Sequence, residues 1–228
     1  MSLYFIVLVV SLVGPLIFSL HPQIKFYKKW GSTFLSGIIV GLPFWIWDSI
    51  ATLRGDWSFN NQYVWSTRIV NLPIEEVLFF IVIPFCCLFV WHLLSQKTDY
   101  KFIQINRQIK YFVLAILIIL SIISRHKFYT STVLLWTVLT IFIVTILQKK
   151  HFQSSKYWLW ILITFVPFLI VNGILTYLPI VEYSPLAIIG WRFVSIPIED
   201  FVYSWCLLTL NLTVYLTLNS PRIVRPVK

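Results

Sequence analysis

The chain contains the acidic sequence Pro73-Ile74-Glu75-Glu76 and a near copy of it, Pro197-Ile198-Glu199-Asp200. Each opens a long apolar stretch, and together they contain four of the eight acidic residues of the chain. Ionised carboxylates are costly beside hydrocarbon, so acidic pairs in these places need a structural or chemical reason. Because the pattern occurs twice, it predicts a site built from two halves.

The composition around these pairs is that of a membrane protein. Of the 228 residues, 59% are hydrophobic and only 11% are charged, which is more apolar than a soluble domain requires. Since a bilayer offers no water to satisfy the backbone, apolar stretches of these lengths are expected to be helices rather than barrel strands. We predict an all-α polytopic fold with seven transmembrane helices, at residues 3–20, 33–53, 74–94, 111–124, 130–147, 157–177 and 197–218.

The net charge of +10 is divided unevenly between the two sides of the predicted bundle. If loops alternate sides, one side carries thirteen Lys and Arg residues and the other carries five. The positive-inside rule then places the N-terminus outside and the C-terminus in the cytoplasm of a multi-pass plasma-membrane protein. The basic excess sets orientation and contacts anionic lipid headgroups, so we expect no nucleic-acid partner. The cytoplasmic set is Lys25, Lys28, Lys29, Lys97, Lys101, Arg107, Lys110, Lys149, Lys150, Lys156, Arg222, Arg225 and Lys228.

An internal repeat relates the two acidic phrases. A shift of 124 residues superposes the halves without a gap and gives ten identities between positions 43 and 75. The polar matches are the informative ones, because apolar coincidences are common in such a composition; Arg68 falls on Arg192, and Asp48 falls on Asn172. We predict a first three-helix repeat at 1–95, a linker with the fourth helix at 96–126 and a second repeat at 127–228.

The unpaired fourth helix sets the relation between the repeats. Three helices followed directly by their copy would be inverted, but one extra crossing restores the orientation. The two repeats are therefore predicted to be parallel, so that both acidic phrases lie at the same outer level of the membrane and face one another.

Two interpretations of the acidic phrases are open. Proline followed by acids is an ordinary helix start, where proline fixes φ and carboxylates favour the helix dipole, with Asn71 and Ser195 just upstream as caps. Alternatively, several carboxyl groups beside an apolar cavity cannot all ionise, which predicts a protonated acid beside an ionised one held charged by Arg68 or Arg192. That arrangement suits acid–base chemistry on an apolar substrate.

Other site chemistries have no matching pattern in the sequence. There is no Gly-rich nucleotide loop, no Ser/His/Asp or zinc arrangement, and no lysine within 197–218 for a retinal Schiff base. Cys86, Cys87 and Cys206 fall inside predicted helices and are expected to be buried thiols. The outer tryptophans are typical of an interfacial aromatic belt, of which a minority could line a cavity.

The doubled Pro-x-Glu-(Glu/Asp) phrase, each copy after an Arg and an aromatic loop, resembles the two-subunit type of bacterial lycopene cyclase, here fused into one chain. The resemblance covers most of the chain and is strongest over 43–80 and 167–205. It implies proton-initiated, non-redox closure of β-ionone rings on lycopene, giving β-carotene by way of γ-carotene. It also implies association with membrane lipid and with other enzymes of carotenoid synthesis. Because no nucleotide fingerprint is present, we expect no required cofactor, and no metal.

The resemblance also suggests roles for individual residues. It implies that the four acids of the two phrases, Glu75, Glu76, Glu199 and Asp200, share the acid and base steps. Supporting roles fall to Arg68, Arg192, Asp48 and Asn172, and contacts with the substrate to Trp47, Phe79 and Tyr203.

Two other functions compete with this one. A cyclase acting on C50 carotenoids would carry the same acids. A small proton-coupled transporter would also have intramembrane acids and repeats, but it needs polar residues through the whole membrane depth. We expect helices three and seven to be almost wholly apolar below the acids, which disfavours transport.

Overall fold

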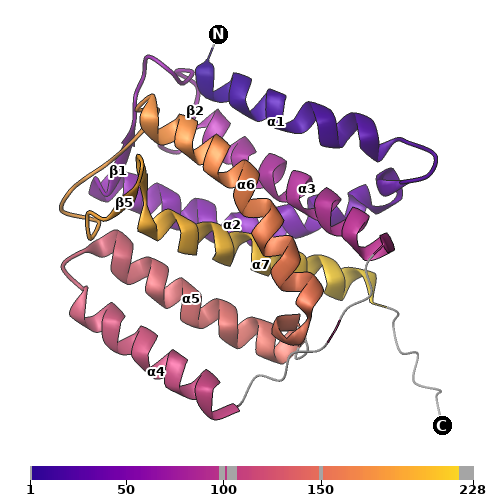
Figure 1. Cartoon of the computed structure of the whole chain (residues 1–228). Coiled ribbons are helices and arrows are strands. Elements are labelled where there is room, and N and C mark those ends of the chain that lie inside the picture. Colours follow the sequence, from indigo (N-terminus) through magenta and orange to yellow (C-terminus); the bar gives the residue numbers. More distant parts are fainter. Residues whose placement is uncertain (1, 98–100, 102–106, 149–150, 221–228) are drawn as a thin grey trace.

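The computed structural model describes residues 2–97, 101, 107–148 and 151–220, and the chain is mostly helical (Figure 1). Seven α-helices are present in this part, as predicted. They are α1 (Leu3–Ser19), α2 (Trp30–Arg54), α3 (Ile74–Lys97), α4 (Arg107–Ile123), α5 (Phe128–Leu147), α6 (Ser155–Tyr177) and α7 (Ile198–Asn219), with short 3-10 turns at Phe26–Lys29 and His151–Gln153.

The helices differ in their capacity to cross a membrane. Five of those described are long and apolar enough to span it, namely α2, α3, α5, α6 and α7. Helices α1 and α4 have 17 residues each, slightly fewer than the ~20 that a span needs. The membrane character of the chain is therefore clear, and the count of seven spans remains a prediction for α1 and α4.

Six short strands, which the all-α prediction did not include, lie in the loops at one end of the bundle. They are β1 (Trp57–Phe59), β2 (Arg68–Ile69), β3 (Leu72–Pro73), β4 (Val181–Tyr183), β5 (Arg192–Phe193) and β6 (Ile196–Pro197). They form three separate antiparallel pairs, β1 with β4, β2 with β3, and β5 with β6.

Two of these pairs are tight hairpins that lead directly into α3 and α7. In the first, Arg68 lies opposite Pro73, and in the second Arg192 lies opposite Pro197. The repeated spacing of arginine and proline thus has a structural cause, because it marks the two ends of a hairpin. Each hairpin fixes the start of a helix, and so fixes the acidic pair that follows.

The third pair, β1 with β4, joins the two halves of the chain. Its central residues are Ser58 and Glu182, which lie 124 positions apart and are therefore equivalent in the sequence repeat. An antiparallel pair centred on equivalent residues relates its strands by a local two-fold rotation. The loops of the two halves consequently meet at the same end of the bundle.

The helices pack in a way that follows the repeat only partly. Helix α1 packs on α3, and α5 packs on α7 in the same manner. Helix α2 lies against both α3 and α7, whereas α6 contacts α3 and crosses the bundle at a steeper angle (Figure 1). The linker helix α4 lies beside α5 at one edge.

The domain limits predicted at 95 and 126 remain predictions. Much of the polar linker, with Asp99, lies outside the described residues, as do Lys149, Lys150, Arg222, Arg225 and Lys228.

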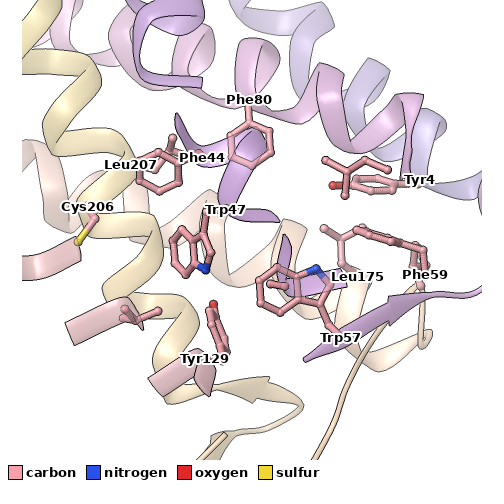
Figure 2. Close-up of a cluster of buried hydrophobic side chains, with 14 of the residues drawn as sticks. Tyr4, Phe44, Trp47, Trp57, Phe59, Phe80, Tyr129, Leu175, Cys206 and Leu207 are labelled. Carbon is pink, nitrogen blue, oxygen red and sulfur yellow. The ribbon is translucent and has the colours of Figure 1, made fainter. Parts of the chain in front are cut away.

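Buried side chains form two apolar clusters along the bundle. The cluster beside the strands combines aromatic residues from both halves, including Phe44, Trp47, Trp57 and Tyr129 (Figure 2). The second, towards the other end, surrounds Trp160. The acidic pairs lie at the first cluster, where apolar walls meet the only carboxyl-rich region of the described chain.

Candidate active site

A cavity of about 360 Å³ lies inside the bundle and ends among three carboxyl groups. The walls come mainly from α1, α3, α6 and α7, with further residues from β1, β4 and the start of α5, and most of the wall atoms are apolar. Asp48 of α2, Glu76 of α3 and Asp200 of α7 lie at the end closest to the strands. An apolar cavity with a few convergent polar groups is the usual form of a binding site for an apolar small molecule.

The first carboxyl cluster contains Glu76 and Asp48. Glu76 lies in the first turn of α3, where the Tyr4 hydroxyl donates a hydrogen bond of 2.7 Å to its Oε2. The Asp48 carboxyl lies within interaction range of Glu76 and of the Trp57 side chain, and its Oδ2 has no hydrogen-bond partner in the described part of the chain. Both acids are buried, at 9% and 2% exposure. Two buried carboxyl groups this close to each other do not readily ionise together, and a proton shared between them would relieve the repulsion.

The second cluster surrounds Asp200 with hydrogen-bond donors. The Tyr129 hydroxyl donates to Oδ1 at 2.6 Å, and the Asn172 amide donates to Oδ2 at 2.7 Å. The Tyr183 hydroxyl donates to the same Oδ2 at 3.0 Å. Burial raises the pKa of the Tyr183 phenol well above 10, so it stays a neutral donor near pH 7. Three donors and no acceptor are the environment of an ionised carboxylate.

The repeat explains why the two clusters differ. Tyr4 and Tyr129 play the same part, one on each acid. Asn172 donates its amide to Asp200, and its repeat equivalent Asp48 lies beside Glu76. An amide is a donor at any pH, but a carboxyl group donates only when protonated. The two equivalent acids thus have different neighbours, a carboxyl group beside Glu76 and an amide and a second phenol beside Asp200.

The other two acids of the repeated phrases do not line the cavity. Glu75 and Glu199 each accept a main-chain N–H bond of 2.7 Å, from Trp65 and Ile189 respectively. The two main-chain donors, Trp65 and Ile189, are again 124 positions apart. Glu199 also accepts a hydrogen bond of 2.6 Å from the Thr130 hydroxyl. These two glutamates connect the loop to the helix start. Neither lines the cavity, and the catalytic role predicted for them remains a prediction.

The two arginines are not brought to any carboxyl group. Arg68 donates to the side chain of Asn61, and Arg192 donates to the carbonyl of Ser195 at 2.7 Å. The expected ion pairs of Arg68 and Arg192 with the site acids are absent among the described residues, although Arg54 does pair with Asp56. Hydroxyl and amide donors take the part predicted for arginine.

Aromatic side chains form much of the wall near the acids. Phe79 and Tyr203, predicted as substrate contacts, line the cavity. Trp47 does not reach the wall, but its ring packs 4.9 Å from that of Tyr203. Trp57 and Tyr129 lie beside it, with ring centroids 4.9 Å apart (Figure 2). Trp57 thus belongs to the cavity and not to an interfacial belt.

Sequence reasoning missed three tyrosines of the site, namely Tyr4, Tyr129 and Tyr183. The first two are repeat equivalents, but they are 125 positions apart, one more than the shift that relates the acids. An ungapped comparison therefore fails to superpose them. A comparison that allowed one inserted residue in the first loop region would have paired them. In the described part of the chain, no group of three His, Cys, Asp or Glu side chains is placed to hold a metal ion.

Comparison with known proteins assigns a class to this fold and site. The sequence matches the family described as lycopene cyclase over residues 1–94 and 126–218, and the two segments end 124 positions apart. The chain belongs to the lycopene cyclase family. It is therefore an enzyme of the cyclase type with a carotenoid substrate, in a bundle of membrane-like helices. No curated protein and no solved structure matches it.

Proposed function

We propose that this chain closes β-ionone rings on the linear end groups of lycopene, giving β-carotene by way of γ-carotene. The observation that supports the proposal is the meeting of Asp48, Glu76 and Asp200 at the end of one apolar cavity, with donors around Asp200. The reaction needs one proton donor and one proton acceptor, and no redox step.

The first step falls to the Asp48–Glu76 pair. Its proton is transferred to the terminal double bond of the end group, and the positive charge appears on the neighbouring tertiary carbon. The next double bond of the same end group attacks that carbon, so the ring closes and the charge moves into the ring. A buried acid is suited to this step because no water competes for the cation.

The second step falls to Asp200. It removes a proton from the ring carbon beside the cation, and the electron pair left behind forms the ring double bond. One proton enters and one leaves, so the product is an isomer of the substrate. Between these steps, the faces of the Phe79, Tyr203 and Trp57 rings stabilise the cation.

Expression in a bacterium that accumulates lycopene tests the proposal. The wild-type chain should yield cyclic carotenoids, and Glu76→Gln and Asp200→Asn should each reduce the yield about 10²-fold or more, as expected when a positioned acid or base is lost. Glu182→Gln is the matched control, because Glu182 is an exposed acid on β4 outside the cavity. Retained activity in both site variants would overturn these roles, and unchanged lycopene with the wild-type chain would favour a C50 substrate.

The alternative function from another class is a proton-coupled transporter, and the polar residues buried in α7 are the observation that favours it. Below the acids α3 is apolar as expected, but α7 buries Thr209, Asn211 and Thr213, which contradicts the prediction for helix seven. Asn211 and Thr213 donate to carbonyls of their own helix, and none of the three lines the cavity. Thr209 is hydrogen-bonded to Tyr157 at 2.8 Å. Asn211 Oδ1 has no partner in the described part of the chain, but it does not border the cavity, which favours the enzyme. Proton uptake into vesicles without cyclic product would favour transport.

The orientation is part of the proposal too. With the N-terminus outside the plasma membrane, the strands and the acid end of the cavity lie towards the outer surface. Association with other enzymes of carotenoid synthesis would deliver the apolar substrate through the membrane.

A further inference from the structure

The two halves of the chain line the cavity unequally, although their acids are equivalent. In α1 and α5, equivalent residues are 125 positions apart, because Tyr4 and Tyr129 bind equivalent acids. Their main-chain N–H groups also donate to Tyr63 and Ala187, which are repeat equivalents. Counting along the two helices from this anchor, Ser11 of α1 corresponds to Trp136 of α5.

On the α1 side, the cavity continues away from the acids. Ser11 and Pro15 of α1 line it, together with Val171 of α6. On α3, the wall extends from Glu76 to Val90, and fourteen residues of helix span about 21 Å. The cavity is therefore an elongated apolar arm, of a shape that fits the linear part of a polyene behind its end group.

On the α5 side, aromatic rings fill the corresponding space. Trp136 stands where the first half has Ser11, and Trp47 stands where the second half has Val171. Their rings stack at 5.7 Å with an interplanar angle of 23°, and the Trp136 ring lies 4.5 Å from that of Phe44, which is fully buried. Neither tryptophan lines the cavity. Trp47 and Trp136 thus fill the space in which an exact repeat of the first half would leave a second arm of the cavity.

From this asymmetry we propose that the chain holds one carotenoid end at a time, with the polyene in the single arm, and that it releases the monocyclic product before the second ring is made. This inference rests on the proposed cyclase function. Both carboxyl clusters converge on one cavity, so the two ends of a substrate cannot react together. After one ring has formed, the linear end can reach the acids only if the molecule reverses direction. A long polyene cannot reverse within an arm between packed helices, so it leaves for the lipid and binds again.

A label chase in membranes that contain the wild-type chain tests the release step. Carbon-13 lycopene is supplied first, and a large excess of unlabelled lycopene is added when labelled γ-carotene appears. If the intermediate is released, unlabelled lycopene competes with it, and labelled γ-carotene persists while labelled β-carotene formation falls in proportion to the dilution. If labelled β-carotene continues to form undiluted, the two rings are made in one binding event and the inference is overturned. The absence of any cyclic product would instead overturn the proposed function.

A pair of matched variants tests the single arm. Val90 of α3 and Val214 of α7 are repeat equivalents, and both are half-buried, but only Val90 lines the cavity. Val90→Trp should block the arm and lower the cyclisation rate about tenfold or more, because apolar pockets respond strongly to added volume. Val214→Trp should leave the rate per folded molecule within about twofold of wild type, because Val214 packs against the apolar cluster and not on the cavity. The amount of folded protein in the membrane is measured for both variants. Equal losses in both variants, or no loss in Val90→Trp, would overturn the single arm.

Discussion

Asp48 and Asn172 occupy equivalent positions of α2 and α6, yet only one of them can carry a proton. Asn172 donates an amide hydrogen to Asp200, and Asp48 can make the same contact to Glu76 only as a protonated acid. We therefore propose that this exchange of a carboxyl group for an amide helps to separate the acid side of the site from the base side. Substitution of either residue by the other tests that proposal directly.

Asp48→Asn should place an amide beside Glu76 and remove the shared proton. We expect the cyclisation rate to fall about 10²- to 10⁴-fold, the usual contribution of a general acid, with the amount of folded protein in the membrane unchanged. Carotenoid products and an immunoblot of the membrane fraction measure the two quantities. A rate near that of wild type would show that the proton comes from elsewhere.

Tyr183→Phe removes one of the three donors to Asp200 and makes the position equal to its repeat equivalent, Phe59. A hydrogen bond to a charged group contributes about 1.5–3 kcal/mol to the ionised form, so without it a smaller fraction of Asp200 is ionised near pH 7 and able to accept the ring proton. The cyclisation rate near pH 7 should therefore fall about tenfold. Phe59→Tyr is the control, since it adds a phenol to the half that carries the proton. Equal effects of the two variants on the initial rate would contradict the assignment of the base to Asp200.

At the level of elements, the hairpins β2–β3 and β5–β6 determine where the acids stand. Each turns through a valine with positive φ, Val70 at 61° and Val194 at 57°. This left-handed conformation is unfavourable for a β-branched residue and is ordinarily taken by glycine. Both side chains are more than four-fifths exposed, so packing within the described chain does not compensate the strain.

Val70→Gly and Val194→Gly should each stabilise the protein by relieving this strain, by about 1 kcal/mol. The expected result is a higher midpoint of thermal unfolding in detergent, with unchanged cyclisation because neither side chain lines the cavity. Val181→Gly, in an extended strand of the wall, is the opposite control and should destabilise. Lower stability in both hairpin variants would show that these valines contribute through lipid contact.

The elements also show how far sequence reasoning reaches. Apolar length predicted every helix, because burial and backbone satisfaction in lipid leave few alternatives. The repeat predicted that two acidic phrases matter, but not that Glu76 and Asp200 face the cavity while their neighbours bind loop N–H groups. That choice depends on the rotation of α3 and α7, which the hairpins set. The sequence also did not predict that tryptophans fill the second arm of the cavity. A tryptophan such as Trp136 gives the same sequence signal whether it packs in a core or lines a cavity wall.

For the whole molecule, the site belongs to neither half alone. The first half supplies Asp48 and Glu76, and the second supplies Asp200 with the tyrosines and amide that bind it. The pair β1–β4, centred on Ser58 and Glu182, joins the halves at the level of these acids. Helix α4 packs on α5 and contributes nothing to the cavity wall. Its part is to connect the halves and, in the predicted topology, to keep them parallel.

Division of the chain between residues 101 and 102 should therefore leave two pieces that are inactive singly and active together. Each piece alone lacks either the acid or the base, whereas coexpression restores both through the helix contacts and β1–β4. Ser58→Pro should impair the divided protein more than the intact one, because a covalent connection keeps the local concentration of the partner high. Pigment from coexpressed pieces, with and without this substitution, gives the measurement. Cyclic product from one piece alone would mean that a single half holds a complete site, and the division of acid and base between the halves would then be wrong.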